Sequence, residues 1–336
     1  MRLVHVVRRS PSLDTKLAAH KLSVVLHARS LYLAAGVVAA LLTGCGEREP
    51  EPRPPEPLPP AVVPSPPVAQ LTGWPAGLGR ALVLRLASPG ETYRLVVPEL
   101  GDSRFADSSI SVKVGDSIPV VLLGRRGKVG QAVLAVLDAE AGTGACLTWP
   151  SAELAAPSFD QRANGAAWRI AAEQDSVTPV LIDSLSGMRS ADSAALTRTV
   201  YSLLPDVPAL TDSTLRGIPF AIRRAYALPA AGISIVVAEL VRTSSSEADP
   251  REQRLFLVGE RTVDAQAHEL VFSSDMTGSA DNTPVTELLV ALVSRESRRP
   301  ILVIGVEGSE GVRLHLMQRV GRRQWRSSWA SVVRFC

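Results

Sequence analysis

Short apolar runs separated by turn-forming residues occupy the chain from about residue 81 onward. Five runs in the first part of this region predict β-strands, at 81–86, 92–97, 110–114, 118–123 and 131–137. Turn signals separate them at a spacing typical of an antiparallel sandwich or barrel, at Pro89-Gly90, Gly101-Asp102, Gly115-Asp116 and 124–127. Polar and apolar residues alternate over 111–114, which indicates one buried and one solvated face. We therefore expect a small all-β domain at 71–144.

Helical spacing is clear at one place in the second part of the chain. Apolar residues recur there at i, i+4, i+7 and i+8, at Leu196, Val200, Leu203 and Leu204. Ser190 and Asp192 precede them as candidates for the helix cap, and Pro205 ends the pattern. This spacing predicts one helix.

Eight further apolar runs follow this helix. They predict strands at 218–226, 233–242, 254–260, 269–273, 285–294, 300–306, 312–320 and 324–333. The spacing within 285–294 fits a helix or a strand, and we expect a strand because its neighbours form a meander. The predicted fold class is mainly β or α+β: the small antiparallel β domain, then an antiparallel sheet domain at 145–336 with one or two helices.

The start of the chain has a different composition, with a basic segment followed by an apolar one. Residues 1–29 contain six basic residues and the single acid Asp14, and residues 31–42 contain no charge. Twelve uncharged residues fit the apolar part of a signal peptide and are shorter than the roughly 20 that span a bilayer as a helix. A signal peptide is therefore a better interpretation than a permanent transmembrane helix.

The apolar run ends in Leu41-Leu42-Thr43-Gly44-Cys45, which resembles the lipobox of bacterial lipoproteins. The resemblance implies that residues 1–44 are a signal peptide and that cleavage occurs before Cys45. It also implies that the thiol of Cys45 becomes attached to diacylglycerol and anchors the protein to a membrane, outside the cytoplasm. Gly46 occupies the position where some bacteria have an aspartate as an inner-membrane retention signal, which favours the outer membrane.

A proline-rich segment follows the lipobox. Ten of the eighteen residues from Pro50 to Pro67 are proline. Such a run lacks the backbone donors of a helix or sheet and favours extended polyproline II. At about 3.1 Å per residue it would separate the next domain from the membrane by roughly 50 Å. We expect residues 45–70 to be a stalk, and the alternative is a ligand for a proline-binding module.

The charge of the chain depends mostly on its first segment. The formal net charge is +3, and residues 1–44 hold six basic residues and one acid, a net +5. Removing them leaves a mature chain of net charge −2. The basic isoelectric point is therefore no indication of nucleic-acid binding.

The chain has three cysteines. If Cys45 is acylated, Cys146 and Cys336 remain, an even number in an oxidising compartment. We expect a disulfide between them that closes the 145–336 domain, and the alternative is two buried free thiols.

A catalytic alternative begins at Gly115-Asp116-Ser117-Ile118, which is similar to the nucleophile block of the GDSL esterase and lipase family. The resemblance implies that Ser117 attacks an ester and needs a histidine base held by an aspartate. The chain offers Asp264 and His268, with three residues between them where the family normally has two. The glycine and asparagine blocks of the family are not found. A turn between two strands is the competing interpretation of this segment.

Other candidate motifs give no cofactor or metal site. A P-loop requires serine or threonine after its lysine, and Val129 follows Lys128, so a hairpin turn explains 124–130 better. Neither His268 nor His315 has a second ligand at zinc spacing, and His315 lies in a predicted strand. Trp325 and Trp329 should share one face of a strand, where we expect them in the core. Arginines at 295–326 fit lipid headgroups, an anionic wall polymer or an ordinary solvated face.

Together these patterns predict a lipid-anchored cell-envelope protein that acts as a non-catalytic binding or envelope-assembly module. Its expected partners are the membrane, through Cys45, and an envelope protein or wall polymer. The expectation includes no metal, no cofactor and no nucleic acid. The alternative function is an esterase that uses Ser117.

Overall fold

The computed structural model describes residues 73–85, 93–101, 112–137, 149–160, 168–208, 215–244, 250–309 and 311–332. The lipobox, the stalk and all three cysteines lie outside these ranges. The predicted lipidation of Cys45 and the predicted bridge between Cys146 and Cys336 therefore stay predictions.

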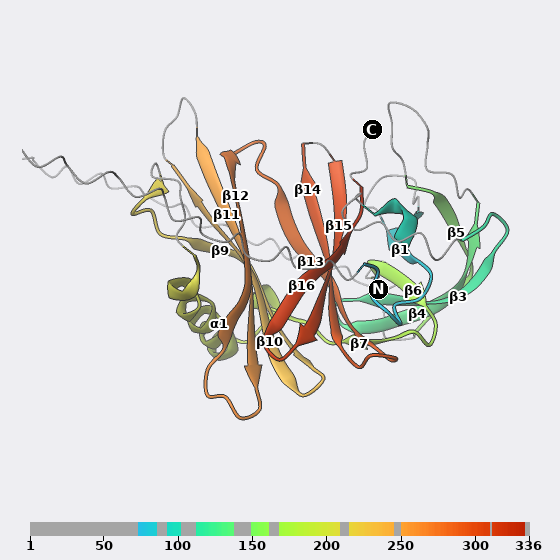
Figure 1. Cartoon of the computed structure of the whole chain (residues 1–336), viewed down its shortest axis with the longest axis horizontal. Coiled ribbons are helices and arrows are strands. Elements are labelled where there is room, and N and C mark those ends of the chain that lie inside the picture. Colours follow the sequence, from blue (N-terminus) through green and yellow to red (C-terminus); the bar gives the residue numbers. More distant parts are fainter. Residues whose placement is uncertain are drawn as a thin grey trace, which may run out of the picture. The chain divides into compact units, whose positions relative to one another are not determined.

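The described part of the chain folds into a closed antiparallel barrel, two antiparallel sheets and one α-helix, so the predicted fold class is confirmed (Figure 1). The barrel has the order β1-β2-β5-β4-β3-β6. Its strands are β1 (Leu82–Arg85), β2 (Tyr93–Val96), β3 (Ser117–Gly124), β4 (Gly127–Val136), β5 (Ser151–Phe159) and β6 (Ile170–Glu173).

The first five-stranded sheet, which we call the helix-side sheet, has the order β12-β11-β10-β9-β8. Its strands are β8 (Asp183–Ser184), β9 (Ala221–Ala230), β10 (Ile233–Thr243), β11 (Arg251–Thr262) and β12 (Glu269–Ser279). The second, the barrel-side sheet, has the order β16-β15-β14-β13-β7. Its strands are β7 (Val177–Val180), β13 (Val285–Ser294), β14 (Pro300–Gly308), β15 (Gly311–Gly321) and β16 (Gln324–Ala330). The segment 285–294 is thus a strand, as predicted.

The barrel includes two strands that follow residue 144. β5 pairs with β2 and β4, and β6 closes the barrel by pairing with both β1 and β3. In that closure Ala172 lies opposite Leu82 on one side and Val121 on the other. The predicted turn at 124–127 connects β3 to β4, and Gly127 has the positive φ of +94° that this connection requires.

The described part of the predicted strand 110–114 is not a strand. Residues 112–114 form an irregular segment and a turn. The backbone N–H of Lys113 donates to a carboxylate oxygen of Asp116 at 3.0 Å, and the N–H of Asp116 donates to the carbonyl of Lys113 at 3.0 Å. Gly115 follows with a φ of +87°. An aspartate that bonds its own neighbouring backbone competes with strand pairing, and this competition overrides the alternating pattern.

The helix α1 (Ser190–Ser202) covers the outer face of the helix-side sheet. Its buried residues Leu196 and Val200 are those that the helical spacing predicted, and they pack with Val236 and Leu257 of the sheet. The predicted cap is wrong, because the N-cap position belongs to Arg189 and no side chain caps it.

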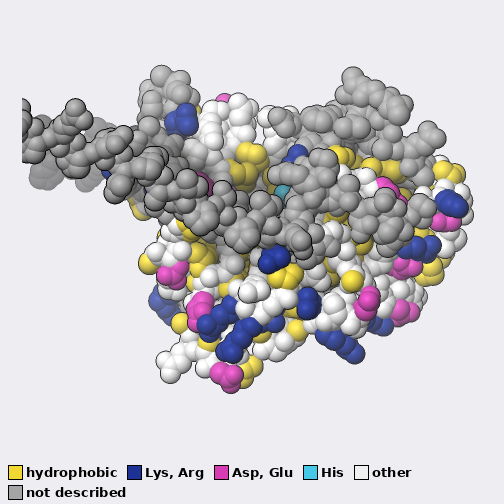
Figure 2. All heavy atoms as spheres, in the orientation of Figure 1, with side chains coloured by type: hydrophobic (Ala, Val, Ile, Leu, Met, Phe, Trp, Pro, Cys, Tyr) yellow, Lys and Arg dark blue, Asp and Glu magenta, His cyan; other side chains and the backbone are white. Residues whose placement is uncertain are grey.

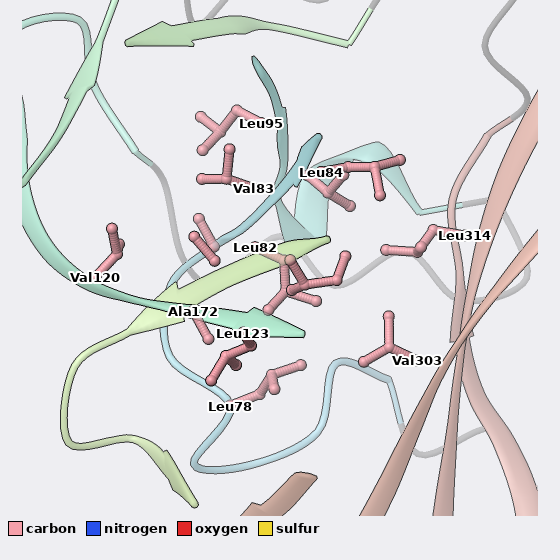
Figure 3. Packing of buried hydrophobic residues seen from close by; sticks show 14 of the residues in the cluster. Leu78, Leu82, Val83, Leu84, Leu95, Val120, Leu123, Ala172, Val303 and Leu314 are labelled. Atoms are coloured by element: carbon pink, nitrogen blue, oxygen red, sulfur yellow. The ribbon is translucent and has the colours of Figure 1, made fainter. Parts of the chain in front are cut away.

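The inner faces of the two sheets pack against each other, and the outer face of the barrel-side sheet packs on the barrel. Figure 3 shows Val303 and Leu314 of that sheet beside Leu84 and Leu123 of the barrel, all in one cluster. The barrel-side sheet is therefore buried on both faces. Full burial of a leucine or valine side chain contributes about 1.5–3 kcal/mol, so this arrangement favours the near-continuous apolar runs of β13 and β14.

Trp325 and Trp329 lie on opposite faces of β16, so the prediction that they share one face is wrong. Met317 pairs with Ser327 and Leu316 with Trp329, which leaves one extra residue in β16, a β-bulge. Trp325 consequently belongs to the cluster between the sheets and Trp329 to the cluster with the barrel. Both are buried, as expected of core residues.

Candidate functional site: a cleft between the two sheets

A cleft of about 470 Å³ lies between the two five-stranded sheets. Its walls come from β11 and β12 on one side and from β13, β14, β15 and β16 on the other. Figure 2, in the orientation of Figure 1, shows hydrophobic side chains among the described atoms between β12 and β14. The size falls within the range of small-molecule sites, about 300–1,000 Å³.

The barrel-side wall follows from the alternation of side chains along β15. Gly311, Arg313, His315 and Met317 face the cleft, whereas Leu314 and Leu316 between them pack toward the barrel. The four cleft positions are separated by six residue steps from first to last, about 20 Å at the usual strand rise of roughly 3.3 Å. Along the cleft face of β15, a glycine therefore comes first, then two polar side chains, and finally the apolar side chain of Met317.

The neighbouring strand β14 places apolar side chains beside these groups. Val306 lies opposite Arg313 and Ile304 opposite His315 in the pairing of β14 with β15. Both also line the cleft. Each polar side chain of this wall therefore has an apolar neighbour.

Two phenylalanines and one methionine make up the apolar part of the helix-side wall. Phe256 of β11 meets Phe272 of β12 edge to face, with ring centroids 6.4 Å apart. Met276, two positions beyond Ser274 on β12, continues the apolar surface. Methionine is flexible and polarisable, which lets it adapt to ligands of irregular shape.

The cleft is apolar at depth and polar at its rim. Phe256, Ile304 and Met317 are 5%, 2% and 2% exposed, and they form the floor. Ser274, Asn282 and Ser309 are exposed and lie at the rim. An apolar floor with a few polar groups around it is the ordinary composition of a ligand site.

Two glycines without side chains line one end of the cleft. Gly308 pairs with Gly311 at the end of the β14–β15 hairpin, and both line the cleft. A Cβ atom on Gly308 would lie 3.3 Å from Cγ of Pro284, which directly precedes the neighbouring strand β13 of the same sheet. Gly311 has a φ of +121°, which other residues rarely adopt.

A network of buried charged side chains binds the backbone of Thr286, a residue that lines the cleft. Glu239 of β10 is 2% exposed. Its carboxylate accepts from Nη1 of Arg224 at 2.9 Å, from Nη1 of Arg254 at 3.1 Å and from the backbone N–H of Thr286 at 3.0 Å. Nε of Arg254 donates to Glu252 at 2.5 Å. With two acids and two bases, the network is neutral, and it joins β10 of one sheet to β13 of the other.

A second buried carboxylate joins the sheets elsewhere. Glu260 of β11 accepts from Nη2 and Nε of Arg319 at 2.7 and 2.9 Å and from Nε1 of Trp325 at 2.8 Å. Burial acts to raise the pKa of Glu260, but the hydrogen bonds from Arg319 and Trp325 outweigh it, so the pKa lies below its ordinary value. Glu260 is therefore ionised, and its hydrogen bonds connect the two sheets.

The structure gives the predicted catalytic histidine a different hydroxyl partner. Ser117 is an exposed residue at the start of β3 in the barrel. His268 precedes β12, and its Nε2 lies 3.1 Å from Oγ of Ser234 on β10. Burial and the nearby Arg261 lower the pKa of His268. No carboxylate among the described residues is hydrogen-bonded to His268, so its second nitrogen has no orienting acid of the kind a triad uses.

The glycine-rich segment at 124–130 serves as a hairpin turn. Gly124 pairs with Gly127, and β4 begins at once. Arg125 in the turn forms an ion pair with Glu287 of β13, and its guanidinium lies 5.3 Å from the ring centroid of Tyr226. The turn thus contacts both five-stranded sheets.

The sequence interpretation did not identify the cleft. It treated His315 as an ordinary sheet residue, and the structure places His315 on the cleft wall. Several arginines in 295–326 have acidic partners on other strands or segments: Arg319 pairs with Glu260, Arg323 with Glu269 and Arg295 with Asp175. The one available signal was the alternation of polar and leucine residues over 311–317.

Comparisons with family models, curated proteins and solved structures give no match to this chain. Within the described ranges, no helix is long and apolar enough to cross a membrane. The same residues contain no group of three or more histidine, cysteine, aspartate or glutamate side chains placed to hold a metal ion.

Proposed function

We propose that this chain is a lipid-anchored, extracytoplasmic binding protein that holds one long hydrocarbon chain in the cleft and does no catalysis. The observation that supports this most directly is the apolar floor formed by Phe256, Ile304 and Met317 within an open cleft. Residues of a closed core would fill such a space, because protein interiors leave few voids larger than a water molecule.

The volume favours a single chain as the occupant. A methylene-sized group takes roughly the 30 Å³ that a water molecule occupies in the liquid, so about 15 of them fill the 470 Å³ of the cleft. The face of β15 is also long enough for an extended chain. Two acyl chains of that length would exceed the space.

The predicted localisation at a membrane is consistent with such a ligand. If Cys45 is acylated, the protein is held at a membrane, the source of long hydrocarbon chains. The proline-rich stalk of residues 45–70 would let the cleft reach ligands roughly 50 Å from the bilayer surface. Each of these two features still requires its own test.

The experiment uses the full lipidated chain in phospholipid nanodiscs and a hexadecanol that bears a photoreactive diazirine near its methyl end. We expect light to attach the probe to peptides that contain the floor residues Phe256, Ile304 or Met317. Excess unlabelled hexadecanol should suppress this labelling. Labelling spread over the whole surface, or none, would reject the proposed function.

A matched pair of tryptophan variants tests the location. Val306→Trp places an indole in the cleft, whereas Val263→Trp places the same group at a position that is 84% exposed. We expect the first to reduce labelling at least tenfold and the second to leave it unchanged. Melting temperatures recorded for both exclude misfolding as the cause, and labelling that persists in a folded Val306→Trp protein contradicts the proposal.

The esterase alternative predicts a different outcome. Ser117→Ala should abolish hydrolysis of any ester substrate if that serine is a nucleophile. Under the binding function it should change neither labelling nor stability, because Ser117 is exposed and lies in the barrel, away from the cleft-lining residues.

A further inference from the structure

The two ends of the cleft differ, because one is polar and exposed and the other is made of packed side chains. The exposed end lies at the β14–β15 hairpin, where Gly308 pairs with Gly311 and Ser309 is exposed. The other end lies further along β15 at Met317, which lines the cleft and is 2% exposed. An extended ligand in the cleft would therefore have one end near water and the other against Met317.

Two ion pairs between the sheets lie directly beyond this packed end. Arg319 follows Met317 by two positions on the same face of β15, and it donates two hydrogen bonds to Glu260 of β11, at 2.7 and 2.9 Å. Arg323, in the β15–β16 turn, pairs with Glu269 at the start of β12 at 2.7 Å. None of these four charged residues lines the cleft. The cleft therefore ends at Met317, before the ion pairs begin.

The residues beyond Met317 leave no path for a longer hydrocarbon chain. The side chain of Glu260 is fully buried, and its carboxylate also accepts from Nε1 of Trp325 at 2.8 Å. A chain that displaced these donors would leave a buried charge without partners, which is strongly unfavourable. On the helix-side wall, Val258 lies between Phe256 and Glu260 on β11 and is fully buried in the cluster between the sheets. Both walls are therefore closed at the same depth.

From this arrangement we infer that Met317 limits the length of the hydrocarbon chain that the cleft accepts. The volume sets the optimum at about 15 methylene-sized groups. A longer chain would leave methylenes in water at the exposed end, whereas the bilayer buries them. A shorter chain would leave the atoms around Met317 without contacts. This inference rests on the proposed function and adds the length class of the ligand.

The test uses the same full lipidated chain in nanodiscs and the photoreactive hexadecanol, with unlabelled saturated primary alcohols from dodecanol to docosanol as competitors. The competitors are compared at equal mole fraction of the lipid, so that their solubility in water does not enter. We expect competition to strengthen up to hexadecanol, and docosanol to compete about tenfold more weakly than hexadecanol. Docosanol that competes as strongly as hexadecanol would overturn the inference and leave the proposed function intact. If the probe fails to label the wild-type cleft at all, the proposed function itself is wrong.

Met317→Ala and Leu134→Ala form the matched pair of variants, since each truncates a buried apolar side chain. Leu134 is 1% exposed, belongs to β4 of the barrel and does not line the cleft. Met317→Ala leaves space for roughly two or three more methylene groups, because the neighbouring side chains relax only in part. We expect it to move the strongest competitor from hexadecanol to octadecanol, and Leu134→Ala to keep hexadecanol as the strongest.

Met317→Val makes the same comparison with a smaller loss of packing. Melting temperatures recorded for all variants show which of them fold, and Met317→Val replaces Met317→Ala if the latter does not. A folded Met317 variant that still prefers hexadecanol contradicts the role assigned to Met317. An equal shift in Leu134→Ala would also contradict it, because the shift would then follow from general loosening of the fold.

Discussion

Arg319 of β15 and Glu260 of β11 form a two-pronged ion pair across the interface of the two sheets. Nη2 of Arg319 donates to Oε1 of Glu260 at 2.7 Å and Nε donates to Oε2 at 2.9 Å. The side chain of Glu260 is fully buried and that of Arg319 is 23% exposed. Parallel hydrogen bonds of this kind fix the relative position of the two strands as well as the distance between them.

We expect Arg319→Ala to lower the free energy of unfolding by about 3–5 kcal/mol, because it leaves a buried carboxylate without its main partner. Arg323→Ala is the matched control, since Arg323 pairs with Glu269 and both side chains are well exposed. Its loss should be about 0–1 kcal/mol. Urea unfolding of the two variants measures the difference, and equal losses would show that the buried pair does not hold the sheets together.

The lowered pKa of Glu260 predicts acid sensitivity. The folded-state pKa lies below the ordinary value of 4.5. The stabilisation is therefore complete above pH 4.5 and is lost as the pH falls through the folded-state value. Glu260→Gln removes this titration, so the stability gap between wild type and variant should narrow below about pH 4.5. Unfolding measured from pH 7 to pH 3 tests this, and a gap that stays constant would contradict it.

Most of the second half of the fold could be predicted from the sequence. Strands such as β10, β13 and β14 have long apolar runs because neighbouring layers cover both of their faces. In contrast, β5 contains Pro157 and mostly exposed residues, and β6, β7 and β8 have four residues or fewer. These strands exist because of their pairing partners, which local patterns do not report.

The cleft was harder to predict than the sheets for a related reason. Its floor joins Phe256, Ile304 and Met317, which come from three strands of two sheets. In the sequence each is one apolar residue among many. The opposite faces of Trp325 and Trp329 illustrate the same limit, because a single-residue bulge at Ser328 reverses the side-chain alternation that spacing alone implies.

The lipobox interpretation predicts that Cys45→Ser blocks processing. The match at Leu42, Thr43 and Gly44 implies that the thiol receives diacylglycerol before cleavage. We expect a radiolabelled fatty acid to enter the wild-type protein and not the variant, and the variant to accumulate as a longer precursor. Gly46→Ala, next to the modified residue, is the control and should be labelled normally. Equal labelling of wild type and Cys45→Ser would remove the predicted anchor.

The expected bridge between Cys146 and Cys336 has its own test. A disulfide that closes so long a loop stabilises by about 4–5 kcal/mol in the chain-entropy model. Reduction should therefore lower the melting temperature, and non-reducing peptide mapping of exported protein should recover the two cysteines in one linked peptide. Recovery of both as free thiols would leave the alternative of two buried cysteines.

Removing one charge from the network around Glu239 should lower the free energy of unfolding strongly. Glu239→Gln keeps the side-chain volume and an acceptor for the N–H of Thr286, but it leaves Arg224 and Arg254 with one acid, Glu252, between them. We expect a loss of about 3–5 kcal/mol, because an unpaired buried charge is costly. Glu153→Gln, at an exposed position of β5, should change stability by less than about 0.5 kcal/mol.

A double-mutant cycle separates the charge imbalance from the loss of a hydrogen bond. Arg254→Met removes one base at similar length, so the double variant with Glu239→Gln restores the balance between acids and bases. We expect the double variant to be more stable than the sum of the single losses predicts, with an interaction energy of about 1–3 kcal/mol. The measurement is urea unfolding of all four proteins at pH 7. Strictly additive losses would mean that Glu239 and Arg254 stabilise the wall behind Thr286 independently, through packing rather than through their charges.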